Sequence, residues 1–358
     1  MKPIFQAVPQ WLDSIDPGAN RRIKGLRLVT TYGLALSCGS LRELTAGVSP
    51  EVALGTLAAG FALWASVFEA RTTRAGSTRD LAALCVAAAA GASFFALLSP
   101  WLDTHVGASS EWILVTGAFL AGYLKRYGFL GAGIGSQIYI GQLLAYGAHL
   151  GPSDLWAINL AGLIAMVAAV VPRLLTGPAE QPTLAPPAPA PLRATSQIVS
   201  PELAMGLQAA TAALIIIALN SALGLTESAW AVTACVYVVT NTAAGTVLRV
   251  RRRIIGTLIG VPLGLACLPI AMHAPLVVWG AACIAMIVYT MALPERYDIA
   301  CAAFAFTLVV TLAASGQHSV AFLLARSWET VLGGLVGMAM ALIMFPLKPA
   351  QPSVRALT

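Results

Sequence analysis

The chain has 358 residues, of which 58% are hydrophobic and only 10% are charged. Soluble domains typically carry about 25% charged residues, so this composition excludes a globular enzyme folded around a single core in water. The net charge of +6 would suit a nucleic-acid-binding protein if the basic side chains formed one patch. They stand instead in short clusters between apolar runs, which excludes that class and indicates a polytopic membrane protein.

Apolar segments follow one another along the chain between these clusters. Residues 1–24 come first, and we expect a cytoplasmic N-terminal segment with a short helix lying in the membrane interface. A span needs roughly 20 mostly apolar residues, and the charge clusters divide the chain into about twelve such segments. In the first half, 25–173, they are 26–45, 51–69, 80–99, 111–124, 129–148 and 155–173. In the second half, 201–347, they are 203–222, 229–247, 254–271, 275–293, 299–315 and 321–346.

A segment of different composition, 174–200, separates the halves. It contains the run TGPAEQPTLAPPAPAPLRATSQ, in which proline prevents a helix and no apolar face exists to bury. We expect an extended, semi-rigid cytoplasmic linker here. Residues 348–358 are expected to form a cytoplasmic tail.

The distribution of charge between loops predicts the direction of the spans. With a cytoplasmic N-terminus, basic residues concentrate in the inner loops and the outer loops hold mainly acidic residues, as the positive-inside rule requires. The inner set is Arg71, Arg74, Arg79, Lys125, Arg126, Arg173, Arg193, Arg249, Arg251, Arg252, Arg253, Arg296, Lys348 and Arg355. The outer set is Arg42, Glu51, Asp103, Glu111, Asp154 and Glu227.

The two halves show signs of a duplication. Six spans in each half give both halves the same orientation, so the repeat is parallel. Short matches occur in the same order in each half: Gly25-Leu26 with Gly206-Leu207, Arg126-Tyr127 with Arg296-Tyr297, and Pro172 with Pro346. The predicted fold class is therefore an all-α polytopic membrane protein of about twelve transmembrane helices, arranged as two parallel six-helix repeats.

A pattern Arg-x-x-(Gly/Glu)-Thr-x-x-Gly occurs twice in the second half. It enters one predicted span from the inner side and another from the outer side, which indicates an inverted three-plus-three unit within each half. The glycines also form small-residue stripes, for which close helix packing is the simpler explanation. The members are Arg253, Gly256, Thr257 and Gly260 in the first copy, and Arg326, Glu329, Thr330 and Gly333 in the second.

Arg326 and Glu329 stand apart because they are ionisable and are expected to lie inside a span. A charge in the bilayer is costly unless it is paired or faces a water-filled cavity. One interpretation is an internal ion pair that fixes helix packing. The other is a transport site in which Arg326 attracts an anionic substrate and Glu329 carries a proton.

Polar side chains inside other predicted spans suggest a path for that substrate. Tyr237 and Thr240, with Asn241 beside them, lie on the eighth predicted span, and Tyr139 and Gln142 lie on the fifth. Hydrogen bonds between helices would explain them, and so would a cavity suited to a small aromatic acid. No nucleophile–base arrangement or metal-ligand spacing is visible, so neither an enzyme nor a bound metal or cofactor is expected.

At the start of the second half the chain resembles a known family. The segment SAWAVTACVYVVTNTAAGTVLRVRRRIIGTLIGVPLG is similar to the signature of the fusaric acid resistance (FUSC) and aromatic acid exporter family, in which a Trp opens one span and a basic run precedes Arg-x-x-Gly-Thr-x-x-Gly. The Trp is Trp230 here, and the resemblance extends over about residues 200–346. The chain looks like a short form, because the large cytoplasmic domain of similar proteins is replaced by the linker.

The resemblance implies an inner-membrane secondary transporter that exports aromatic carboxylic acids or related toxic organic anions, driven by the proton gradient. Both termini would be cytoplasmic in a bacterial cell. The implied partners are a small organic anion, the lipid bilayer, a periplasmic adaptor protein and further copies of the chain in a homo-oligomer, with no nucleic acid. Two alternatives remain open, a passive organic-anion channel and a non-transporting membrane factor in envelope or pigment assembly.

Overall fold

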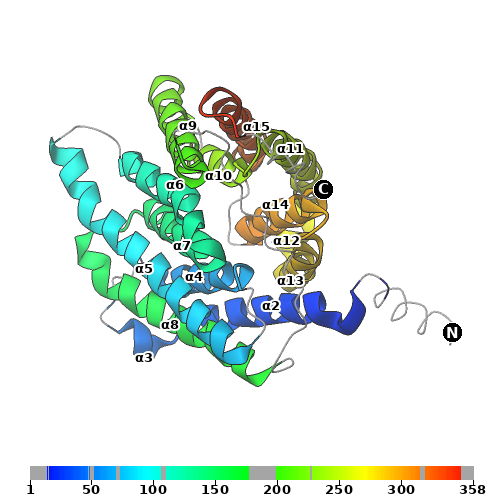
Figure 1. Ribbon diagram of the computed structural model, residues 1–358. Coiled ribbons are helices and arrows are strands. Elements are labelled where there is room, and N and C mark those ends of the chain that lie inside the picture. Colours follow the sequence, from blue (N-terminus) through cyan, green and yellow to red (C-terminus); the bar gives the residue numbers. More distant parts are fainter. Residues whose placement is uncertain are drawn as a thin grey trace, which may run out of the picture. The chain divides into compact units, whose positions relative to one another are not determined.

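The computed structural model of the chain is shown in Figure 1, and it describes residues 14, 16–46, 48, 52–69, 73–105, 110–176, 199–225, 228–314 and 319–347. The expected tail, 348–358, and nearly all of the expected linker, 174–200, lie outside the described residues. Most of the N-terminal segment, including residues 1–13, also lies outside them.

The described residues are helical and contain no β-strand, which confirms the all-α class. The first group of helices is α2 (Asn20–Gly39), α3 (Arg42–Thr45), α4 (Leu54–Val67), α5 (Arg74–His105), α6 (Ile113–Tyr123), α7 (Gly128–Gly147) and α8 (Leu155–Leu175). The second is α9 (Pro201–Leu223), α10 (Ser228–Val238), α11 (Ala243–Ala266), α12 (Leu268–His273), α13 (Pro275–Ala292), α14 (Tyr297–Ala314) and α15 (Val320–Ile343). Short 3₁₀ turns are η1 (Pro17–Ala19), η2 (Ser110–Trp112), η3 (Leu124–Tyr127) and η4 (Pro152–Asp154).

Five helices in the described part of the chain are long and apolar enough to cross a membrane: α5, η4 with α8, α9, α13 and α15. The protein is therefore a multi-pass membrane protein. Shorter apolar helices, among them α4, α10 and α14, fall on other predicted spans. The count of twelve spans stays a prediction.

Local sequence explains how α9 begins and ends. The Ser200 side chain accepts a hydrogen bond from the amide of Leu203, and Pro201 occupies the first turn, where its missing N–H leaves no donor unsatisfied. Gly224 ends the helix in the left-handed conformation, with φ of 64°. These signals agree with the predicted seventh span to within two residues.

The eighth predicted span, 229–247, is wrong in its second part. Helix α10 ends at Val238, and residues from Ala243 onward belong to α11. The break carries three threonines whose hydroxyls bond to nearby backbone: Thr242 Oγ1 accepts from the amide of Gly245, and Thr246 Oγ1 accepts from the amide of Thr240. Threonine side chains compete in this way with the regular helical bonds of the backbone.

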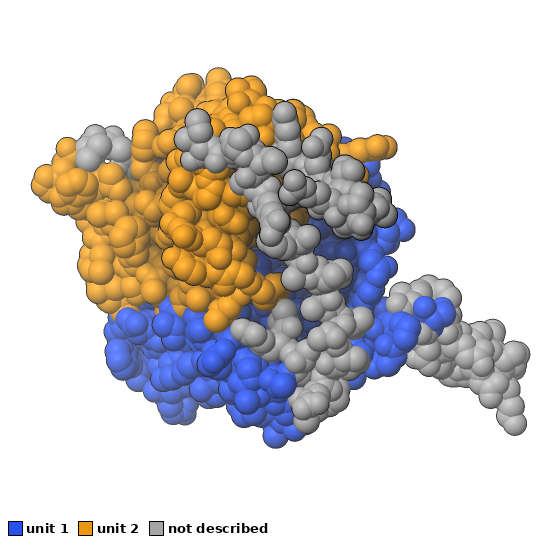
Figure 2. Space-filling model, in the orientation of Figure 1, with its two compact units in different colours: residues 1–86, 156–181, 252–327 blue, residues 87–155, 182–251, 328–358 orange. Residues whose placement is uncertain are grey.

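The helices form two compact units, which Figure 2 colours separately. Unit 1 comprises residues 1–86, 156–181 and 252–327, and unit 2 comprises 87–155, 182–251 and 328–358. Each unit takes helices from both predicted halves of the chain. Division by contacts thus differs from division along the sequence.

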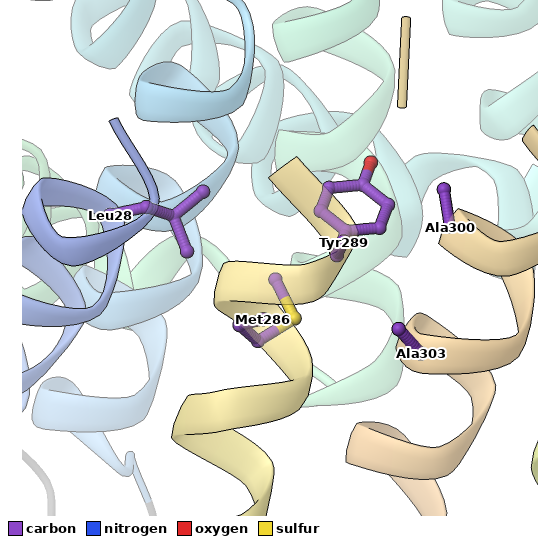
Figure 3. Packing of buried hydrophobic residues seen from close by; sticks show 5 residues of the cluster. All are labelled: Leu28, Met286, Tyr289, Ala300 and Ala303. Atoms are coloured by element: carbon purple, nitrogen blue, oxygen red, sulfur yellow. The ribbon is translucent and has the colours of Figure 1, made fainter. Parts of the chain in front are cut away.

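Within unit 1, helix α2 has two main neighbours. It packs on α4 and on α13, and α13 packs on α14. Figure 3 shows the core at this junction, where Leu28 of α2 faces Met286 and Tyr289 of α13, with Ala300 and Ala303 of α14 beside them. The Trp64 ring of α4 reaches Phe304 of the same cluster, with ring centroids 5.4 Å apart.

Unit 2 repeats this order with the halves exchanged. Helix α9 packs on α10 and on α6, and α6 packs on α7. In unit 1, the first predicted span contacts the second and the tenth, and the tenth contacts the eleventh. In unit 2, the seventh predicted span contacts the eighth and the fourth, and the fourth contacts the fifth. In these three pairs of contacts, each predicted span of unit 2 is six places along the chain from a predicted span of unit 1.

Close approach at Gly260 offers a test of packing in unit 1. A Cβ added to Gly260 on α11 would lie 2.2 Å from the carbonyl oxygen of Ala302 on α14. We therefore expect Gly260→Ala to lower the free energy of unfolding by about 1–3 kcal/mol, the usual cost of overpacking. Gly280→Ala is the matched control, because nothing lies within 4 Å of a Cβ there. The measurement is the fraction of detergent-solubilised protein that stays monodisperse after heating, and equal loss in both variants would contradict the prediction.

Candidate functional site

Two ionisable side chains are buried on helix α15. Arg326 is 5% exposed and Glu329 is fully buried at 0%, and α15 is one of the five candidate spans. Their spacing of three residues puts them on one face of the helix. Arg326 belongs to the part of α15 in unit 1 and Glu329 to the part in unit 2. Charged groups buried within a span are costly and are usually functional.

Gly333 of the second motif and Gly337, one turn later, fix the position of Glu329 along α10. A Cβ on Gly333 would meet the Ala231 carbonyl oxygen at 2.1 Å, and one on Gly337 would meet the Cys235 carbonyl oxygen at 3.0 Å. Contacts that advance by four residues on both helices mean that α10 and α15 run in the same direction. One turn earlier, Glu329 and the buried Thr330 lie level with the first turn of α10, which contains Trp230.

Tyrosine side chains from α7 and α10 meet in unit 2. The hydroxyl of the fully buried Tyr139 lies 2.9 Å from Thr233 Oγ1, and the hydroxyl of Tyr237 lies 2.7 Å from Ser136 Oγ. The two rings are edge to face, with centroids 6.0 Å apart. The polar faces expected on the fifth and eighth spans therefore lie together and are bonded to each other.

Gln142, also on α7, binds to the scaffold at both ends of its amide. Its Oε1 accepts from the Gly117 amide at 3.1 Å, and its Nε2 donates to Thr116 Oγ1 at 3.0 Å. Both partners lie on α6. These bonds join α6 to α7. They agree with the interpretation that Gln142 forms hydrogen bonds between helices.

Thr240 and Asn241 lie in the break between α10 and α11. Thr240 Oγ1 donates to the Thr242 carbonyl oxygen at 3.0 Å, which holds the break in shape. The half-buried side chain of Asn241 makes no hydrogen bond to any residue that the structure describes. Of the predicted substrate-binding residues in unit 2, Asn241 has the freest polar group.

The first motif lies in unit 1, with its glycines against α14. A Cβ on Gly256 would lie 2.3 Å from the Asp298 carbonyl oxygen, so this residue packs as closely as Gly260 does. Thr257 is buried between them, and Arg253 donates to the Tyr297 hydroxyl at 3.3 Å. Close helix packing accounts for these motif residues.

A buried carboxylate that sequence reasoning missed joins three helices of unit 2. Glu111, expected in an outer loop, is 2% exposed and lies in η2 before α6. The Asn220 amide of α9 donates to both of its oxygens at 2.9 Å, Tyr146 of α7 donates at 2.5 Å, and Ser228 of α10 donates as well. The one sequence signal for this burial was the position of Glu111 next to Trp112, at the start of an apolar run.

A second missed cluster lies in unit 1. Glu69, just after α4, pairs with Arg173 of α8 at 2.9 Å and with Arg27 of α2 at 3.4 Å, and it accepts from Ser77 of α5. All four side chains are at least nine-tenths buried. From the sequence, Arg173 was placed in the inner basic set and no role was given to Arg27 or Glu69, because the three residues are distant from one another in the chain.

Comparison with known proteins points to one family. Residues 212–340 match the family described as fusaric acid resistance protein-like. The match runs from α9 to α15 and contains both Arg-Thr-Gly motifs, Tyr237 and Asn241. Searches of curated proteins and of solved structures returned no match.

Proposed function

We propose that this protein exports aromatic carboxylic acids or related organic anions across a bacterial inner membrane, driven by the proton gradient. The proposal starts from the match of residues 212–340 to the fusaric acid resistance protein-like family. The observation that carries the proposal is the burial of Arg326 and Glu329, one turn apart, within a candidate span. Such groups mark substrate and proton pathways in membrane proteins.

In the proposed mechanism, the Arg326 guanidinium binds the carboxylate of the substrate, since it presents paired N–H donors to two oxygens. Glu329 takes up or releases the proton that is exchanged for it. Tyr139 and Tyr237 supply apolar ring faces with a hydroxyl at the tip, a combination suited to an aromatic acid. Thr240, Asn241 and Gln142 complete the polar groups along the path.

We also propose the architecture of twelve spans in two parallel repeats, with both termini cytoplasmic. The matching order of contacts in the two units supports the duplication. So do two corresponding glycines: a Cβ on Gly25 of α2 would lie 3.0 Å from Ile287 Cα of α13, and one on Gly206 of α9 would lie 2.9 Å from the Phe119 carbonyl oxygen of α6. Gly25 and Gly206 are the residues that the sequence comparison had paired.

The test is transport by purified protein in liposomes, with a panel of labelled aromatic acids and an imposed pH gradient. We expect saturable movement of at least one acid against its gradient, which stops when a protonophore is added. Arg326→Gln should lower the rate by at least about tenfold, because a bond between charged groups contributes roughly 1.5–3 kcal/mol. Arg251→Gln is the control, since Arg251 is exposed.

Each alternative has its own outcome in this experiment. Transport that continues with unchanged rate after protonophore treatment, and only down the substrate gradient, would identify a passive channel. No movement of any acid by well-folded protein would favour a non-transporting membrane factor. Either result would overturn the proposed coupling.

A further inference from the structure

Lys125 occupies an unusual position at the end of α6. Its ammonium group donates to the Val239 carbonyl oxygen at 3.3 Å and lies 4.0 Å from the Met205 sulfur. Because α10 ends at Val238, that carbonyl lies at the open end of a helix, where a positive charge is favoured. One role of Lys125 is thus to cap α10.

Capping of α10 does not use all the hydrogen-bond donors of Lys125. An ammonium group has three N–H donors, and a thioether is only a weak acceptor. Lys125 is half-buried and makes no other hydrogen bond to the described residues. At least one donor therefore remains for a ligand.

A second cation acts on Lys125 from α11. Burial, and then the charge of Arg249, lower the pKa of Lys125 to about 8. Two like charges that interact in a partly buried place repel each other, and an anion between them would relieve the repulsion. The other charged groups on the adjoining elements include Glu202 in the first turn of α9 and Arg126, whose guanidinium lies over the rings of Tyr123 and Tyr127. Helix α11 also carries Arg251, Arg252 and Arg253.

The third component is the α10–α11 break. Irregular backbone within a membrane protein is tolerated where it is buried in protein or lines a cavity, and transporters bind ions at such interrupted helices. The Asn241 amide, two residues beyond the carbonyl that Lys125 binds, makes no hydrogen bond to the described residues. Thr240, Thr242 and Thr246 hold the break in shape through their own bonds.

We propose that Lys125, Arg249 and Asn241 form a carboxylate-binding site at the α10–α11 break, where an organic anion is received on its way through the protein. The ligand class rests on the proposed function. Its residues all belong to unit 2, and Arg326 is not one of them. Charge distribution assigns this end of α6 to the cytoplasmic side, from which an exported acid would come.

The test measures benzoate binding to the purified full-length chain in neutral-lipid nanodiscs by calorimetry at pH 7. We expect Lys125→Met to weaken binding by about tenfold or more, because a charge-assisted bond is lost. Asn241→Ala should weaken it less, as expected for a neutral donor. Lys24→Met is the matched control, because Lys24 also donates to carbonyl oxygens at a helix end, those of Val67, the last residue of α4, and of Glu69 just after it.

Several outcomes separate the site from a mere cap. If Lys125→Met and Lys24→Met lose thermal stability alike and both keep the wild-type affinity for benzoate, Lys125 only caps α10 and the proposal falls. The same follows if benzoate does not bind but phosphatidylglycerol raises the melting temperature in a Lys125-dependent way, because the ligand is then a lipid phosphate. Should Lys125→Met fail to fold, Lys125→Arg and Asn241→Ala still decide the question.

Proton linkage gives a readout that a structural role would not produce. A bound anion favours the charged amine and raises its pKa, so benzoate binding near pH 8 should take up protons and weaken as the pH rises further. Calorimetry in two buffers of different ionisation enthalpy measures this uptake, and Lys125→Arg should abolish it while keeping affinity. Benzoate binding without any transport would leave the site in place and overturn the proposed function instead. Transport together with benzoate binding that does not depend on Lys125 would overturn the proposed site and leave the proposed function in place.

Discussion

Glu69→Gln is expected to lower the free energy of unfolding by about 3–5 kcal/mol, the cost of leaving buried charges without their partner. The Glu69 carboxylate lies 2.9 Å from Arg173 and 3.4 Å from Arg27, and all three side chains are almost fully buried. Glutamine keeps the shape of the side chain and removes the charge that both guanidinium groups face. Because the three residues come from different parts of the chain, unit 1 should lose the connection between α2, the end of α4 and α8.

A second Glu–Arg pair in the same unit supplies the control. Glu295 lies 2.6 Å from Arg21, closer than either buried contact, but its side chain is 68% exposed. Exposed pairs contribute roughly 0–1 kcal/mol, so Glu295→Gln should change stability little. Loss of folded protein on heating in detergent compares the two variants directly. Equal, small losses of folded protein in the two variants would show that the Glu69 cluster does not stabilise unit 1.

The sequence predicted the all-α class, and it predicted the bounds of α9 because that helix has a local signal at each end. Ser200 and Pro201 begin α9 and Gly224 ends it, and charge clusters separate most of the others. The break after Val238 was missed because its threonines and Asn241 are short polar residues that a span can also accommodate. Only the bonds that Thr242 and Thr246 make to nearby amides show that the helix stops there.

Contacts between distant residues are what the sequence could not show. In the sequence, Arg27, Glu69 and Arg173 are ordinary charged residues, and only folding brings them together. Glu111 is expected in a loop from the sequence, but Asn220 and Tyr146 bind it in the structure. The sequence also could not show that each unit takes helices from both halves, because this too depends on contacts between distant residues. Periodicity and charge describe which face of a helix is apolar, but they do not say whether α2 packs on a helix of its own half or of the other.

Two buried carboxylates of unit 2, those of Glu111 and Glu329, have different surroundings. Glu111 receives hydrogen bonds from α7, α9 and α10, so its carboxylate holds three helices together. Glu329 lies on the helix that also carries Arg326, within the part that matches the fusaric acid resistance protein-like family. The proposed mechanism assigns the proton to Glu329 alone, and the two carboxylates therefore provide a comparison within one unit.

Glu329→Gln is expected to abolish transport driven by a pH gradient, because glutamine cannot take up or release a proton. Movement of the acid down its own gradient should continue, since Arg326 and the tyrosines remain in place. In liposomes, the variant should exchange labelled for unlabelled acid at a rate that is the same with and without the pH gradient. Accumulation against the substrate gradient by this variant would exclude Glu329 as the coupling residue.

Glu111→Gln should have the opposite effects. Asn220 donates to both carboxylate oxygens, and its own Oδ1 accepts from the Leu225 amide at 2.9 Å, so it cannot turn to receive a donor. The new glutamine NH₂ would therefore face another donor, at a cost of about 1–3 kcal/mol for a buried polar group left unsatisfied. We expect lower thermal stability together with pH-driven transport that persists in the folded fraction. Loss of coupling in Glu111→Gln and its retention in Glu329→Gln would transfer the proton-carrying role to Glu111.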